Sequence, residues 1–154
     1  PPANQGRHDM SSWMRTVIIG FIAGALSVFI FHQLGFWISN ELGYTRSVLY
    51  NMRGVPPWGV PTIVSSAFWG GLWGIVAAFL VPRLPGALGG VLGWILFAAI
   101  IVAIVNWTVV LPIKSGRFNM PGLPIIVVLP LVYGLWGFGM WLIARGARAA
   151  LGWR

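Results

Sequence analysis

Residues 61–111 have the sequence PTIVSSAFWGGLWGIVAAFLVPRLPGALGGVLGWILFAAIIVAIVNWTVVL, in which Arg83 is the one charged residue. Residues 82–86 interrupt this apolar stretch with two prolines, an arginine and a glycine. The apolar run on either side is long enough to cross the roughly 30 Å hydrocarbon core of a bilayer as a helix. The stretch therefore predicts two transmembrane helices joined by a tight turn.

Apolar runs of similar length lie before and after this stretch. The polar segment 40–59, which contains the adjacent prolines Pro56 and Pro57, separates it from the first run and predicts a loop outside the membrane. The fold class predicted is an all-α integral membrane protein, a four-transmembrane-helix bundle that forms a single membrane domain over residues 1–154. The predicted spans are about 14–39, 61–81, 87–111 and 123–144.

The composition excludes a soluble enzyme. Hydrophobic residues make up 58% of the chain and charged residues 8%, whereas a soluble domain carries about 25% charged residues. Cysteine is absent, which excludes disulfides and thiolate chemistry. Asp9 and Glu41 are the only carboxylates, and they fall on opposite sides of the predicted membrane. We therefore expect no catalytic residues, no metal site and no enzymatic activity.

The basic residues lie in the gaps between the apolar runs. The chain has 10 Lys and Arg against 2 Asp and Glu, a net charge of +8. No basic face with interleaved aromatics exists, so these residues indicate topology and contacts with anionic lipid headgroups, not nucleic-acid binding. One side of the predicted membrane holds both termini with Arg7, Arg15, Arg83, Arg145, Arg148 and Arg154, and the other holds Arg46, Arg53, Lys114 and Arg117. This imbalance favours cytoplasmic termini.

Small residues recur at four-residue spacing in three of the predicted spans, which allows helix backbones to approach closely. The pairs are Gly20 and Gly24, Gly70 and Gly74, and Gly89 and Gly93. We expect them to pack the helices of the bundle, with docking onto a helix of another protein as the alternative.

Four of the ten tryptophans lie deep in the predicted spans: Trp69, Trp73, Trp94 and Trp136. They either fill gaps opened by the neighbouring glycines or face a flat cofactor, a pigment or a lipid.

His32 and Gln33 are the strongest polar anomaly inside a predicted span. Polar groups at this depth are costly and indicate a functional site by default. The predicted topology brings Ser66 and Asn106 to the same level. We therefore predict a small polar pocket of His32, Gln33, Ser66 and Asn106 that binds a ligand or contacts a partner. The alternative is that His32 and Gln33 only hydrogen-bond to neighbouring helices.

The chemistry of such a pocket is restricted. The only other histidine, His8, lies in the N-terminal tail on the opposite side, so bis-histidine haem and zinc are excluded within one chain. What remains is a hydrogen-bonding site for a quinone-like or lipid headgroup, or a contact with a partner protein.

Four segments together resemble a group of small four-span bacterial inner-membrane proteins of unassigned function. They are FHQ (31–33), PWGVP (57–61), FWGGLWG (68–74) and VVLPIKSG (109–116). The resemblance implies a helical membrane fold and a bacterial inner-membrane location, and it implies no catalytic role.

We expect a non-catalytic subunit or accessory protein of a larger inner-membrane complex, respiratory or photosynthetic. Its partners would be other membrane subunits, lipids and a quinone that it helps to position. A first alternative is a small homo-oligomeric transporter or channel with its polar site at His32 and Gln33. A second is a protein that binds a quinone or a pigment on its own account.

Overall fold

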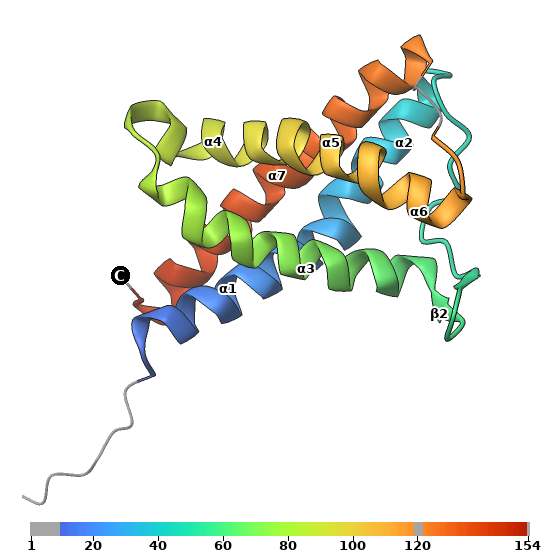
Figure 1. The fold of residues 1–154 in the computed structure, drawn as a ribbon. Coiled ribbons are helices and arrows are strands. Elements are labelled where there is room, and N and C mark those ends of the chain that lie inside the picture. Colours follow the sequence, from blue (N-terminus) through green and yellow to red (C-terminus); the bar gives the residue numbers. More distant parts are fainter. Residues whose placement is uncertain (1–9, 119–121, 154) are drawn as a thin grey trace, which may run out of the picture.

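The four predicted spans form helices. The computed structural model describes residues 10–118 and 122–153, so Arg7, His8, Asp9 and Arg154 lie outside the described residues. Four helical stretches in the described part are long and apolar enough to cross a membrane: Ser12–Glu41, Thr62–Arg83, Val91–Ile113 and Ile126–Leu151. They pack as an all-α four-helix bundle, which confirms the predicted fold class (Figure 1).

The first span consists of α1 (Ser12–Ser27), the π-helical turn η1 (Val28–His32) and α2 (Gln33–Glu41). A loop follows, with a short antiparallel pair of strands, β1 (Gly54–Val55) and β2 (Val60–Pro61). The loop is fastened to the first span by Tyr50, whose amide donates to Gln33 Oε1 (2.9 Å) and whose hydroxyl donates to the Phe29 carbonyl (2.8 Å). Gln33 is therefore an anchor for the loop.

The second span is α3 (Thr62–Leu80), which ends in the 3₁₀ turn η2 (Val81–Arg83). The third span comprises α4 (Val91–Leu96), the π-helical η4 (Phe97–Val102), α5 (Ala103–Val105), the π-helical η5 (Asn106–Val110) and α6 (Leu111–Ser115). The fourth lies in one long helix, α7 (Leu123–Leu151).

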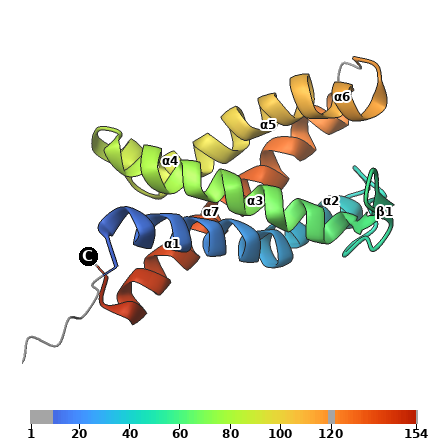
Figure 2. The same cartoon turned by 60° about the horizontal axis from the view of Figure 1, so that its bottom comes forward.

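The four spans do not all pack against one another. α3 runs along α1, while α7 packs against both the first and the third span (Figures 1 and 2). Within the described residues, α3 and the third span have no extended interface beyond the turn that joins them. The second and third spans therefore meet mainly through side chains, such as Trp73 and Phe97.

Glycines bring α1 and α3 into backbone contact. A Cβ atom built on Gly24 would lie 2.0 Å from the carbonyl oxygen of Gly70, and one on Gly74 would lie 2.1 Å from that of Gly20. Side chains at these positions would force the helices apart. The close approach allows the two helices to be held by van der Waals packing without a hydrophobic driving force.

Gly89 and Gly93 have a different role from the one predicted. Gly89 lies in the 3₁₀ turn η3 (Gly86–Gly89), and Gly90 is extended, so the third helix begins at Val91 and not near residue 87. A Cβ on Gly89 would meet the Leu84 carbonyl at 2.8 Å, and one on Gly93 would meet the Leu88 carbonyl at 1.7 Å. The pair lets the turn fold back on itself, and Gly93 also lies against the end of the second span, since its Cβ would meet Val81 at 2.9 Å.

Candidate functional site

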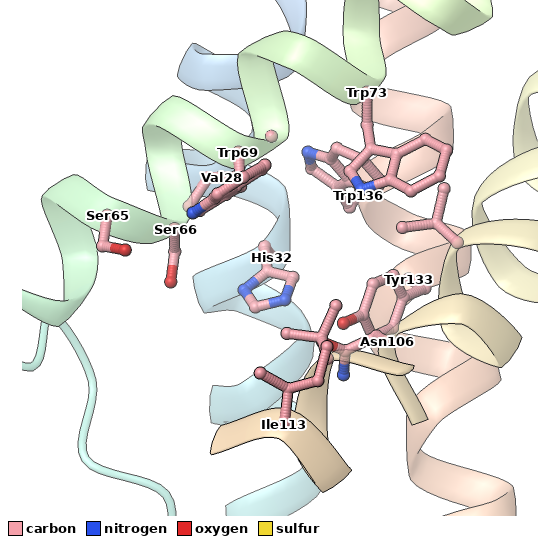
Figure 3. A pocket seen from close by; sticks show the side chains of 13 residues that line it. Val28, His32, Ser65, Ser66, Trp69, Trp73, Asn106, Ile113, Tyr133 and Trp136 are labelled. Carbon is pink, nitrogen blue, oxygen red and sulfur yellow. The ribbon is translucent and has the colours of Figure 1, made fainter. Parts of the chain in front are cut away.

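A partly open cavity of about 430 Å³ lies in the space between α3 and the third span. Residues of all four spans line it, with η1 and α7 contributing the remaining wall (Figure 3). Its size falls within the range of about 300–1,000 Å³ that is usual for small-molecule sites. The membrane-spanning helices therefore enclose a partly open cavity of ligand size.

Five hydrogen-bonding side chains line this cavity: His32 of η1, Ser65 and Ser66 of α3, Asn106 of η5, and Tyr133 of α7. None of the five side chains forms a hydrogen bond with any residue that the structure describes. The Nδ1 atom of His32 is fully buried in this state. Buried polar atoms are normally paired, so His32 Nδ1 is the exceptional atom of this lining, while Ser65, Ser66, Asn106 and Tyr133 are half-buried side chains.

The His32 ring is fixed by aromatic contacts. It makes edge-to-face contacts with Tyr133 (ring centroids 5.7 Å apart, interplanar angle 90°) and with Phe36 (4.8 Å, 88°). Figure 3 shows the imidazole between Ser66 on one side and Tyr133 and Asn106 on the other. The two ring contacts orient the imidazole without using its nitrogen atoms.

Two of the five polar residues belong to π-helical turns, His32 to η1 and Asn106 to η5. Turns of this kind are rare and frequently occur at functional sites. The Phe29 carbonyl in η1 accepts the hydrogen bond from the Tyr50 hydroxyl. The loop outside the bundle thus supports the turn that presents His32.

Tryptophans supply the apolar surface of the cavity. Trp136 is buried and doubly held: its indole N–H donates to the Gly24 carbonyl (3.1 Å), and its own carbonyl accepts from Ser27 Oγ (2.7 Å). Trp73 makes an edge-to-face contact with Phe97 at 6.0 Å. Trp69 lines the cavity and is 56% exposed. Flat aromatic faces therefore alternate with hydrogen-bonding groups around the same space.

Among the side chains that the structure describes, which do not include that of Lys114, no Asp, Glu, Lys or Arg lines the cavity. Among the described residues, no cluster of three or more His, Asp or Glu side chains is placed to hold a metal ion. An environment with these properties suits an uncharged ligand that combines polar atoms with a flat apolar body.

The structure brings together three of the four residues of the predicted pocket, His32, Ser66 and Asn106, and leaves Gln33 out. Gln33 is 7% exposed and is bound to the Tyr50 amide. Successive residues of a helix point about 100° apart, so neighbours in sequence such as His32 and Gln33 face different surroundings. The predicted pocket did not include Ser65 and Tyr133, for which polarity inside a span is the available signal. Trp69, Trp73 and Trp136, which the sequence offers as possible faces for a flat ligand, also line the cavity.

No protein-family model, curated protein or solved structure matches the chain.

Proposed function

We propose that the protein is a non-catalytic membrane subunit or accessory protein that holds a quinone-type headgroup in the cavity around His32. One observation carries the proposal: five polar side chains line a cavity between membrane-spanning helices and have no partner among the described residues. An unsatisfied buried polar group costs about 1–3 kcal/mol. Among the five side chains, the Nδ1 atom of His32 is the one that is fully buried without a partner, and a ligand that hydrogen-bonds to this atom recovers that free energy.

A quinone fits the chemistry of the lining residues. Its two carbonyl oxygens accept hydrogen bonds, and the two hydroxyls of its reduced form also donate them. A neutral imidazole, a tyrosine hydroxyl and an asparagine amide each offer both a donor and an acceptor, so His32, Tyr133 and Asn106 can serve either form. The tryptophans match the flat ring, and the apolar part of the lining suits an apolar tail.

The wider setting belongs to the same proposal: a larger respiratory or photosynthetic assembly in the bacterial inner membrane, with cytoplasmic termini. Its support is the sequence resemblance, the distribution of arginines and the scarcity of ionisable groups in the spans. The alternative, a homo-oligomeric transporter, requires His32 and Gln33 on one path. Gln33 is not among the residues lining the cavity and its side chain accepts from the loop, so the accessory-subunit proposal is preferred.

The test is a titration of the purified chain, in mild detergent, with a short-tailed benzoquinone, followed by quenching of tryptophan fluorescence. We expect saturable binding, and the His32→Ala variant should bind about tenfold more weakly because one or two hydrogen bonds are lost. Thr108→Val is the matched control, since Thr108 is exposed and its hydroxyl donates to the Ile104 carbonyl of its own helix. Equal affinity of wild type and His32→Ala would refute the proposed site.

Extraction from native membranes tests the accessory role separately. The chain should elute within a larger particle that contains other membrane subunits. If it elutes alone, without any partner, the accessory role is wrong whatever the titration shows.

A further inference from the structure

A second cavity, of about 470 Å³, lies at the end of the bundle where the first span begins and α7 ends. Three arginines from three different elements line it: Arg15 of α1, Arg83 of η2 and Arg148 of α7. No residue lines both this cavity and the one around His32. The two sites are therefore separate and can be tested independently.

Among residues 10–118 and 122–153, no acidic side chain lines the cavity with the three arginines. Glu41 is the one carboxylate in the described part of the chain, and it ends the first span at the opposite end of the bundle. Among the described residues, no ion pair is formed by Arg15, Arg83 or Arg148. Three like charges that share a cavity repel one another, so a bound anion would relieve this repulsion.

Two of the guanidinium groups are already oriented. Arg15 donates through Nε to the Met10 carbonyl (3.0 Å), and its Cζ lies 5.5 Å from the centre of the Trp153 ring. Arg83 donates to the Phe79 carbonyl and lies 5.7 Å from the Phe79 ring centre. Each guanidinium carries five N–H donors. These contacts therefore leave donors on both groups for a ligand.

The position of the cavity matches the headgroup region of a bilayer. Arg15 lies in the first turn of its span, Arg83 is the last residue of its span, and Arg148 lies in the last turn of α7. Trp13 and Trp153 line the same cavity, and indole rings prefer this interface. Ile19 and Ala78 continue the wall on the apolar side. The cavity thus combines guanidinium groups, which suit a lipid phosphate, with an apolar surface, which suits the start of the acyl chains.

We propose that this cavity binds the phosphodiester group of an anionic phospholipid, with Arg15, Arg83 and Arg148 as its ligands. Guanidinium groups recognise phosphate oxygens through paired, charge-assisted hydrogen bonds, and basic pockets between transmembrane helices are suited to anionic headgroups. A lipid bound here would contact the first, second and fourth spans together.

The experiment compares the thermal stability of the purified full chain in detergent supplemented with phosphatidylglycerol, phosphatidylcholine or inorganic phosphate. We expect phosphatidylglycerol alone to raise the Tm, and the Arg15→Gln/Arg148→Gln double variant to lose this rise. The Arg46→Gln/Arg53→Gln double variant removes two exposed charges at the opposite end and should keep the rise. Loss of the rise in both double variants, or no rise in the wild type, would overturn the proposal.

Inorganic phosphate separates the two sources of the phosphate group. An equal rise with phosphate alone would mean that the site takes a free anion, and the lipid assignment would be wrong. Arg83→Gln is a second test, because Arg83 is exposed and the contacts that its side chain makes within the protein are with Phe79, four residues earlier in its own span. In native mass spectrometry this variant should retain phosphatidylglycerol about tenfold less well than wild type, and unchanged retention would count against the site.

Discussion

Gly24 and Gly70 hold α1 and α3 in backbone contact, since a methyl group on Gly24 would lie 2.0 Å from the Gly70 carbonyl oxygen. The carbonyl of Gly24 also accepts the hydrogen bond from the Trp136 indole. One glycine therefore fixes the distance between two helices and the orientation of a cavity wall.

Substitution of this glycine should separate the helices. Gly24→Ala is expected to lower the stability by about 1–3 kcal/mol, because the backbone of α3 must move. The measurement is the Tm in detergent by circular dichroism. Gly146→Ala in α7 is the control, as nothing lies within 4 Å of a Cβ at that position. A Tm for Gly24→Ala equal to that of the control would contradict the close contact.

The hydroxyl of Tyr133 should matter for ligand binding and not for stability. Tyr133→Phe keeps the edge-to-face contact with His32 and removes only a hydroxyl without a partner among the described residues. We expect an unchanged Tm and a several-fold weaker affinity for the benzoquinone probe. A marked loss of stability would show that the hydroxyl is used within the protein.

Gln33 should behave in the opposite way to its neighbour His32. Gln33→Leu removes the acceptor of the Tyr50 amide, so loop 42–61 should lose protection in hydrogen exchange and the stability should fall by about 1 kcal/mol. The affinity for the benzoquinone probe should stay within about twofold of wild type. A large loss of affinity would place Gln33 in the ligand site after all.

Two serines offer a matched pair for the hydrogen bond behind Trp136. Ser27→Ala removes a buried donor to the Trp136 carbonyl and should cost about 1 kcal/mol, measured as a lower Tm. Ser65→Ala removes a hydroxyl that bonds to no described residue and should leave the Tm unchanged. Equal effects of the two substitutions would argue against a structural role for the Ser27 hydroxyl.

The number and position of the spans follow from the sequence, because apolar length alone decides what can cross a bilayer. The start of the third helix does not follow so simply. Gly86, Gly89, Gly90 and Gly93 have the spacing of a helix face, yet Gly86 adopts a positive φ of 58° and Gly90 is extended. A spacing rule cannot tell a glycine that packs two helices from one that permits a turn.

The sequence predicts only some of the residues that line the cavity. Depth in the membrane can be counted along a helix, which brought His32, Ser66 and Asn106 to one level. The rotation of each helix about its axis depends on packing, and this decided that Tyr133 faces the cavity and Gln33 the loop. The π-helical turns that carry His32 and Asn106 shift the rotation further, and no pattern in the sequence indicated them.

Two hydrogen bonds of Tyr50 connect the loop between the first and second spans to the middle of the first span. Its two bonds reach Phe29 and Gln33, which bracket the residue that presents its imidazole to the cavity. The loop is thus tied to the first span on either side of His32 in the sequence, while the imidazole itself is held by its contacts with Tyr133 and Phe36.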